Sequence, residues 1–263
     1  MATVDFSLQD RVAIITGGSK GIGRAIALAF AEHGADIAIV ARGAEALEKT
    51  RKEIEAVGRR CGAVEADLAN EDEWPGIVDL TVKAFGGVDI LVNNAATAAG
   101  YGPIVNTDGA AWDTVMRVNL KASFYLSTLC RTHMLKRGGG SVIHVTSNEA
   151  VRPSFGIGCY SVSKGALVTL TQICAKEWAP DQIRVNCIAP GLIRTELAAG
   201  LVRMVEKSGV YPNPMRRIGE PNEIAGLALY LASPAGKYAT GQNFVVDGGE
   251  LVLAPTDPIT VRK

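Results

Sequence analysis

The chain has 263 residues, of which 48% are hydrophobic and 21% are charged. Lys and Arg together number 27, as do Asp and Glu, so the formal net charge is zero. Domains that bind nucleic acids are commonly basic with a high pI, whereas the pI of this sequence is about 6.8. We therefore expect neither a nucleic-acid partner nor attraction to an anionic membrane.

Cysteines, histidines and apolar runs exclude further classes of protein. The five cysteines form no Cys-x-x-Cys motif, which argues against a disulfide framework and a zinc ribbon. The three histidines form no His-Glu-x-x-His motif, so we expect no metal site. No apolar run reaches the roughly 18 residues of a membrane span, and residues 1–5 do not resemble a signal peptide. We expect a soluble, cytoplasmic globular protein.

Short apolar runs alternate with amphipathic segments along the chain. Strands are predicted at residues 11–15, 36–40, 62–66, 88–92, 141–146, 183–188 and 243–246, and helices at 22–33, 44–57, 71–85, 110–136, 159–178 and 221–232. Strands that are apolar throughout are covered on both faces, as in a parallel sheet between helices. The pattern predicts one α/β domain over residues 1–263, with a doubly wound parallel sheet of about seven strands and helices on both faces.

Two segments depart from this alternation. Residues 192–217 contain a short predicted helix followed by Tyr-Pro-Asn-Pro, and they are too long for an ordinary connection. We expect this segment to be a substrate loop, and its apolar side chains indicate a medium-sized, substantially apolar substrate. The tail at residues 251–263 carries Pro255 and Pro258 and is predicted to be extended.

A glycine-rich turn lies between the first predicted strand and the first helix. Its sequence, Thr-Gly-Gly-Ser-Lys-Gly-Ile-Gly at residues 16–23, lets the chain turn sharply and lets the backbone approach a ligand closely. The N-terminus of the following helix offers free N–H groups to phosphates. The turn therefore favours dinucleotide binding over the alternative of a plain tight turn.

The residues after the second strand indicate which dinucleotide is bound. An acidic residue there favours NAD, because it accepts a hydrogen bond from the ribose 2′-hydroxyl. This chain has Arg42 at that position and Lys20 in the turn, and two cations suit the 2′-phosphate of NADP. Glu45 is expected to face solvent one turn into the next helix. The alternative is that Arg42 is only a surface charge.

Tyr160 and Lys164 are four residues apart, so they share one face of a helix. An ammonium near a phenol favours the phenolate, which lowers the phenol pKa and makes the tyrosine a usable proton donor and acceptor. Ser147 follows the fifth strand and could donate a hydrogen bond to a substrate oxygen. Taken alone, the Tyr-Lys spacing is also that of an ordinary surface pair.

Several motifs occur together in a fixed order. They are Thr-Gly-x-x-x-Gly-Ile-Gly at 16–23, Asp67-Leu68, Asn93-Asn94-Ala95, Asn119, Ser147, Tyr160-x-x-x-Lys164 and Pro190-Gly191. From residue 8 to 250 the chain resembles the short-chain dehydrogenase/reductase family. It is similar to the short single-domain branch that includes 3-oxoacyl-carrier-protein reductases and tropinone-reductase-like enzymes. One departure is Ala96, where the family usually has glycine.

This resemblance implies a Rossmann-type fold and four catalytic residues. Tyr160 would give its proton to the carbonyl oxygen, and Lys164 would lower the tyrosine pKa and bind the nicotinamide ribose. Ser147 would polarise the carbonyl. Asn119 would anchor a water that links Lys164 to solvent.

The resemblance also implies the cofactor contacts and the assembly. The cofactor-binding residues would be Gly17, Ser19, Lys20, Gly21, Ile22, Gly23, Arg42, Asp67, Leu68, Asn94, Ala95, Tyr160, Lys164, Pro190, Gly191, Ile193 and Thr195. Asp67 would hydrogen-bond the adenine, and the last four would contact the nicotinamide. A homotetramer packed through the helices that contain Asn119 and Tyr160 is expected.

The sequence therefore predicts an oxidoreductase that reversibly reduces a ketone to a secondary alcohol, with hydride from NADPH and a proton from Tyr160. The alternatives are an NAD-dependent secondary alcohol dehydrogenase and a non-catalytic nucleotide-binding subunit. Two nearby residues are also open to interpretation. His144 is expected to be a satisfied core histidine, whereas Glu149 is either a solvated loop carboxylate or a contact for a polar or cationic substrate group.

Overall fold

The computed structural model describes residues 3–98 and 100–252. Seven parallel strands form one sheet in the order β3-β2-β1-β4-β5-β6-β7. The strands are β1 (Val12–Thr16), β2 (Asp36–Ala41), β3 (Cys61–Glu65), β4 (Ile90–Asn93), β5 (Gly140–Val145), β6 (Ile183–Pro190) and β7 (Asn243–Val246). The predicted fold class is confirmed.

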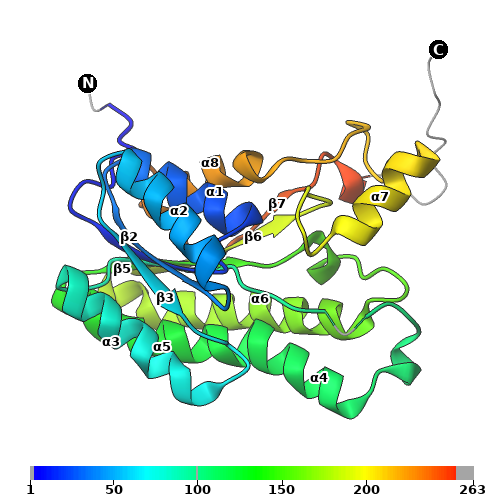
Figure 1. Ribbon diagram of the computed structural model, residues 1–263, viewed down its shortest axis with the longest axis horizontal. Coiled ribbons are helices and arrows are strands. Elements are labelled where there is room, and N and C mark those ends of the chain that lie inside the picture. Colours follow the sequence, from blue (N-terminus) through cyan, green and yellow to red (C-terminus); the bar gives the residue numbers. More distant parts are fainter. Residues whose placement is uncertain (1–2, 99, 253–263) are drawn as a thin grey trace.

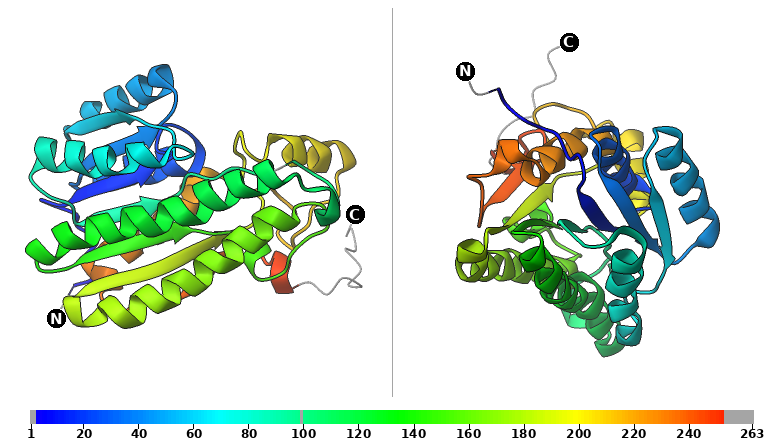
Figure 2. Two further views of the ribbon diagram at one scale, coloured as in Figure 1. Left: turned by 90° about the horizontal axis from the view of Figure 1, so that it is seen from below. Right: turned by 90° about the vertical axis from the view of Figure 1, so that its left-hand side faces the viewer.

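Helices cover both faces of the sheet (Figure 1). One face is covered by α1 (Gly21–Glu32), α2 (Ala44–Ala56) and α8 (Pro221–Ala232), and the other by α3 (Trp74–Phe85), α5 (Ala122–Lys136) and α6 (Gly158–Trp178). Helix α4 (Gly109–Met116) continues the line of α5, as Figure 2 shows, and α7 (Ala199–Ser208) stands beyond the sheet. No helix in the described part of the chain is long and apolar enough to cross a membrane.

Alternating side chains of the strands fill two cores, one on each face of the sheet. In β1, Ile15 packs into the core under α1 and α8, together with Phe30 and Ile224. Its neighbour Ile14 packs into the opposite core, with Ile77 and other residues of α3, α5 and α6. This arrangement follows from the two-residue period of a strand, and it explains why these strands are apolar at every position.

Apart from shifts of one or two residues at their ends, the predicted elements differ from the observed ones in three places. The helix expected at 110–136 is interrupted by a π-helical turn at Arg117–Lys121, which contains Asn119. The helix expected at 71–85 begins as a 3₁₀ turn, Glu71–Glu73, because Pro75 lies in the first turn of α3. The prediction of an extended tail from residue 251 is wrong for residues 251 and 252, which belong to a 3₁₀ turn, Glu250–Val252. Residues 253–263 lie outside the described part of the chain.

The segment between β6 and α8 folds into a small body of its own. Ile193 pairs with Gly219 as an isolated β-bridge, so the two ends of the segment lie together. Between them, Val202, Val205 and Ile218 form a separate apolar cluster. The predicted substrate loop is therefore closed at its base and packed internally.

Sheet order determines where a ligand can bind. Strand β1 lies between β2 and β4 in the sheet. The connection after β1 leads toward β2, whereas the connection after β4 leads toward β5, so the two run in opposite directions. Loops that diverge at the carboxyl ends of such strands leave a crevice. The glycine-rich turn after β1 and the Asn94-Ala95 segment after β4 both open into this crevice.

Candidate cofactor-binding and catalytic site

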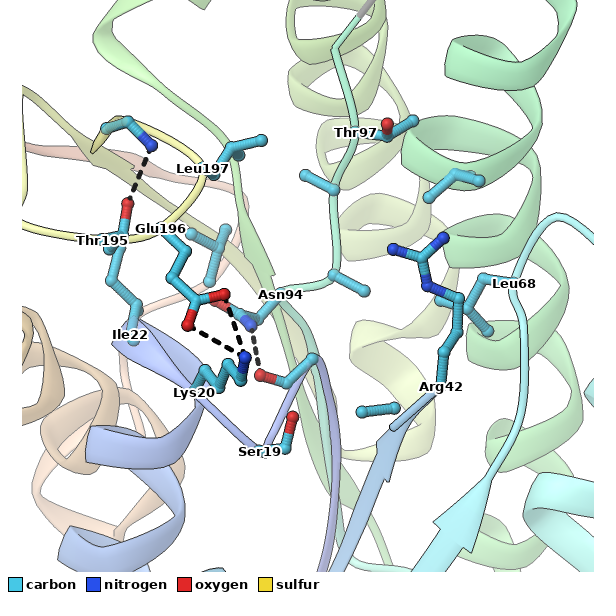
Figure 3. Close-up of a pocket in the computed structure, with 18 of the residues that line it drawn as sticks. Ser19, Lys20, Ile22, Arg42, Leu68, Asn94, Thr97, Thr195, Glu196 and Leu197 are labelled. Atoms are coloured by element: carbon cyan, nitrogen blue, oxygen red, sulfur yellow. Dashed lines mark hydrogen bonds and ion pairs between the residues drawn. The ribbon is translucent and has the colours of Figure 1, made fainter. Parts of the chain in front are cut away.

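A cavity of about 640 Å³ lies at the carboxyl edge of the sheet. The ends of β1, β2, β3, β4, β5 and β6 contribute to its lining, together with α6 and the start of the substrate loop (Figure 3). Among the predicted site residues, only Gly23 and Asn119 are absent from its lining. The structure thus brings almost all of the predicted residues around one cavity.

The glycine-rich turn is too closely packed to accept side chains. A Cβ atom on Gly17 would lie 2.7 Å from Nδ2 of Asn94, and Gly17 has a φ of 64°. A Cβ atom on Gly23 would lie 2.3 Å from the carbonyl oxygen of Gly17. Gly23 therefore shapes the turn from behind, which explains why it does not line the cavity.

Hydrogen bonds fix this turn to the end of β4. The Thr16 hydroxyl accepts from the backbone N–H groups of Asn94 (2.9 Å) and Ala95 (3.0 Å). The Asn94 side-chain amide donates to the carbonyl oxygens of Thr16 (2.9 Å) and Gly17 (3.3 Å). Asn94 therefore braces the turn as well as lining the cavity, a role that the sequence did not show.

The two cations assigned to a 2′-phosphate do not act as a pair. Nζ of Lys20 lies 2.9 Å from Oε1 of Glu196 in the substrate loop, and in Figure 3 Lys20 points toward Glu196 rather than toward Arg42. Arg42 is exposed, and within the described residues its guanidinium has no ion pair or hydrogen bond. Glu45 is exposed, as expected.

The loop after β3 provides the opposite wall of the cavity. One carboxylate oxygen of Asp67 accepts from the backbone N–H of Ala69 at 3.0 Å. The Leu68 carbonyl accepts from the indole of Trp74, whose ring is buried in the core. These contacts hold Asp67 and Leu68 in the lining of the cavity, where the family resemblance predicts that the adenine binds.

The catalytic candidates meet at the other end of the cavity. Tyr160 and Lys164 lie one turn apart near the start of α6, and Ser147 follows β5. The Ser147 hydroxyl lies close enough to the Tyr160 phenol to lower its pKa, and it also donates to Oδ1 of Asn148 at 3.3 Å. Lys164 is buried, donates to the Val145 carbonyl at 2.8 Å and lies 5.6 Å from the centre of the Tyr160 ring.

Burial controls the ionisation of both groups. Loss of solvation raises the pKa of Tyr160 to about 12, although its hydrogen bond with Ser147 acts in the opposite direction. Burial lowers the pKa of Lys164 to about 8. The predicted lowering of the Tyr160 pKa by Lys164 is wrong for this structure, because desolvation outweighs any charge attraction. At neutral pH Tyr160 therefore carries its proton and can donate it.

Asn119 acts from outside the cavity wall. Its amide oxygen accepts from the backbone N–H of Thr97 at 2.9 Å, and its amide nitrogen donates to the Thr97 carbonyl (2.9 Å) and to the Ser163 hydroxyl (3.0 Å). The side chain thus ties the segment after β4 to α6, the helix that contains Tyr160 and Lys164. π-Helical turns of this kind are frequent at functional sites.

Two further polar groups support the site. The Asn93 amide lies 3.1 Å from Nδ1 of His144 and bridges β4 and β5. Burial lowers the pKa of His144 to about 3, so it is neutral, but its Nε2 atom has no hydrogen-bond partner, and the prediction of a fully satisfied histidine is wrong. Glu149 accepts from the backbone N–H and hydroxyl of Ser154 and from the Ser161 hydroxyl. Its carboxylate therefore fixes the loop before α6.

Sequence comparisons identify the protein family to which this chain belongs. A family model described as enoyl-(acyl carrier protein) reductase matches residues 17–250. Dehydrogenase/reductase SDR family member 4 from Homo sapiens is 37% identical over 244 residues, which are 92% of this chain and 88% of that protein. The chain belongs to the short-chain dehydrogenase/reductase (SDR) family.

Solved structures of similar proteins include two complexes. L-Sorbose reductase from Gluconobacter frateurii with NADPH and L-sorbose is 34% identical with a TM-score of 0.87, covering 95% of this SDR and 100% of that chain. A 7α-hydroxysteroid dehydrogenase with NADH and 7-oxo glycochenodeoxycholic acid is 34% identical with a TM-score of 0.89, covering 95% and 97%. The two neighbours thus contain different nicotinamide cofactors and chemically different substrates.

Sequence reasoning missed several residues of the cavity in this SDR. Thr97, Val118, Thr146, Glu196 and Leu197 also line it. A charge next to Thr195 was the signal that could have drawn attention to Glu196. Among residues 3–98 and 100–252, no three His, Cys, Asp or Glu side chains are grouped as a metal site requires.

The low pKa of His144 gives this SDR a specific dependence on pH. Below about pH 6.5 the unfolded chain protonates His144, whereas the folded protein, with a pKa of about 3, does not. Stability therefore falls as the pH falls from about 6.5 toward 3, by at most about 1.4 kcal/mol per pH unit from this residue. His144→Asn keeps an acceptor for Asn93 and should lose this contribution in urea unfolding between about pH 7 and pH 5. His33→Asn, at an exposed position, should follow the wild type, and equal slopes for all three proteins would contradict the assignment.

Proposed function

We propose that this SDR is an NADP-dependent oxidoreductase that reversibly reduces a ketone to a secondary alcohol. The observation that carries the proposal is that the Tyr160 phenol, which keeps its proton at neutral pH, and the Ser147 hydroxyl line the same cavity as the glycine-rich turn. A phenol and a hydroxyl that converge in this way can both donate to one carbonyl oxygen. As that oxygen gains negative charge, transfer of the Tyr160 proton to it completes the alcohol.

The residues at the turn fit a dinucleotide. The first turn of α1 contains no acidic residue, and its N-cap, Lys20, makes no capping hydrogen bond through its side chain. The N–H groups of this turn therefore remain available to a pyrophosphate. Gly17, Gly21 and Ile22 would surround it, and Lys164 would donate to the nicotinamide ribose. When bound, the nicotinamide supplies the hydride.

Arg42 supports NADP over NAD. It is exposed at the end of β2, without an ion-pair partner among the described residues, and it lines the cavity. No carboxylate occupies the position that would accept from a ribose 2′-hydroxyl. An NAD-dependent secondary alcohol dehydrogenase is the second candidate, and the pairing of Lys20 with Glu196 favours it, since only Arg42 is then left free. The presence of all four catalytic residues argues against a non-catalytic subunit.

The substrate loop supports a medium-sized, substantially apolar ketone. Leu197 and Ala198 line the cavity from this loop, and Val118 lines it from the π-helical turn. Leu201 and Met204 are exposed on α7. The neighbours described above contain a steroid and a sugar, and the apolar lining of this SDR favours the first kind of substrate.

We also propose a homotetramer. Phe124 on α5 and Ile173 on α6 are 42% and 48% exposed, and both line a shallow groove with Leu120 and Leu170. Exposed apolar patches of this kind commonly mark protein interfaces. Sedimentation of the purified protein should give four times the 27.7 kDa of one chain, and a monomeric mass would contradict the proposal.

Replacement of the proton donor tests the mechanism. Tyr160→Phe should lower kcat for ketone reduction by about 10²- to 10⁴-fold, because it removes the proton that balances the developing charge. The dissociation constant for NADPH should change little. Tyr238→Phe is the matched control, since Tyr238 is fully exposed. Retention of activity in Tyr160→Phe would disprove the assigned role.

Replacement of Arg42 tests the cofactor. Arg42→Ala should raise the dissociation constant for NADPH by about 10- to 100-fold, the range expected for a lost hydrogen bond to a charged group. Binding of NADH should stay within about threefold of the wild type. Lys52→Ala, which removes a charge from an exposed position on α2, should affect neither cofactor. Equal losses for NADPH and NADH would favour the NAD-dependent alternative.

A further inference from the structure

One ion pair joins the glycine-rich turn to the substrate loop. Nζ of Lys20 lies 2.9 Å from Oε1 and 3.0 Å from Oε2 of Glu196. Both residues line the main cavity, and both also line a second hollow of about 620 Å³ next to the N-terminus of α8. Figure 3 shows the Lys20 and Glu196 side chains pointing toward each other across the gap between the turn and the loop.

Other contacts hold the residues on either side of Glu196, so the Lys20–Glu196 ion pair can hold only a short part of the substrate loop. On one side, the Arg194 backbone donates to the Gly219 carbonyl, and its guanidinium pairs with Glu206 and Glu220. On the other side, Ala198 packs against the loop's own core of Val202, Val205 and Ile218. Only the short segment of Thr195, Glu196 and Leu197 lies between these two anchored parts, and Leu197 faces the cavity while remaining 57% exposed.

Lys20 can easily exchange Glu196 for another anionic partner. The side chains of Lys20 and Glu196 are 55% and 76% exposed, and ion pairs in water contribute little to stability. A phosphate carries nearly two negative charges at neutral pH and three acceptor oxygens. A phosphate group placed within reach of Lys20 should therefore displace the singly charged Glu196 carboxylate.

We propose that Glu196 couples the substrate loop to the 2′-phosphate of the cofactor by competing for Lys20. With a nucleotide that lacks this phosphate, Lys20 stays paired with Glu196, and residues 195–197 are held against the turn. The 2′-phosphate draws Lys20 away and frees these residues. The inference rests on the proposed use of NADP, and it adds a residue outside the predicted set to the determinants of cofactor specificity.

Binding of nucleotide fragments tests the competition without any catalytic step. Calorimetry should give dissociation constants for 2′,5′-ADP and 5′-AMP with the wild type, Glu196→Gln and Glu206→Gln. Glu196→Gln should bind 2′,5′-ADP about two- to fivefold more tightly, because Lys20 no longer exchanges partners. Its affinity for 5′-AMP should remain that of the wild type. Glu206→Gln removes the same charge from the same loop and should change neither constant.

The outcomes separate the two proposals. If the wild type prefers 2′,5′-ADP but Glu196→Gln binds both fragments as the wild type does, the competition is disproved and the use of NADP stands. If the wild type does not distinguish the fragments, the use of NADP fails, and the competition fails with it. In a Lys20→Met background, Glu196→Gln should have no further effect, and a persisting effect would show that Glu196 acts without Lys20.

Hydrogen exchange reports the state of the loop directly. In the wild type, the amides of residues 195–197 should exchange faster with saturating 2′,5′-ADP than with saturating 5′-AMP. In Glu196→Gln the exchange should be fast with both fragments. Equal exchange rates in the wild type with the two fragments would overturn the coupling.

Discussion

The close contact between the glycine-rich turn and the end of β4 is the constraint on which the site depends. A Cβ atom on Gly23 would overlap the Gly17 carbonyl, and Asn94 occupies the space that a Cβ atom on Gly17 would need. Thr16 and Asn94 convert this contact into a set of hydrogen bonds between neighbouring strands. Because the strands are rigid, the position of the turn is fixed relative to β5, and hence relative to Ser147 and Tyr160.

At the other end of the cavity, the loss of solvation is the largest effect on the pKa values of Tyr160 and Lys164. Lys164 has lost nearly all contact with water. Its ammonium group donates a hydrogen bond to the Val145 carbonyl at the end of β5, which partly replaces the lost hydration. Tyr160 keeps its proton for the same reason. The cavity therefore presents a protonated phenol next to an amine whose pKa is lowered, as the proposed proton transfer requires. The buried, neutral His144 and its Asn93 partner provide rigid support under this arrangement.

Features that depend on local sequence were predictable, and features that depend on distant contacts were not. Apolar strands such as Asp36–Ala41 and the Tyr160–Lys164 spacing follow from period and proximity along the chain. The π-helical turn around Asn119 follows no such period. The pairing of Lys20 with Glu196 joins residues that are 176 positions apart, and the pKa of Tyr160 depends on burial by the whole fold.

The bridge between Ile193 and Gly219 has a consequence for how this scaffold can diversify. The segment it closes has its own small core of Val202, Val205 and Ile218, separate from the two cores of the sheet. Replacing that segment would alter the shape of the binding cavity while leaving the folding of the sheet largely undisturbed. This segment can therefore change as an exchangeable module, independently of the part of the cavity that Ser147, Tyr160 and Lys164 line.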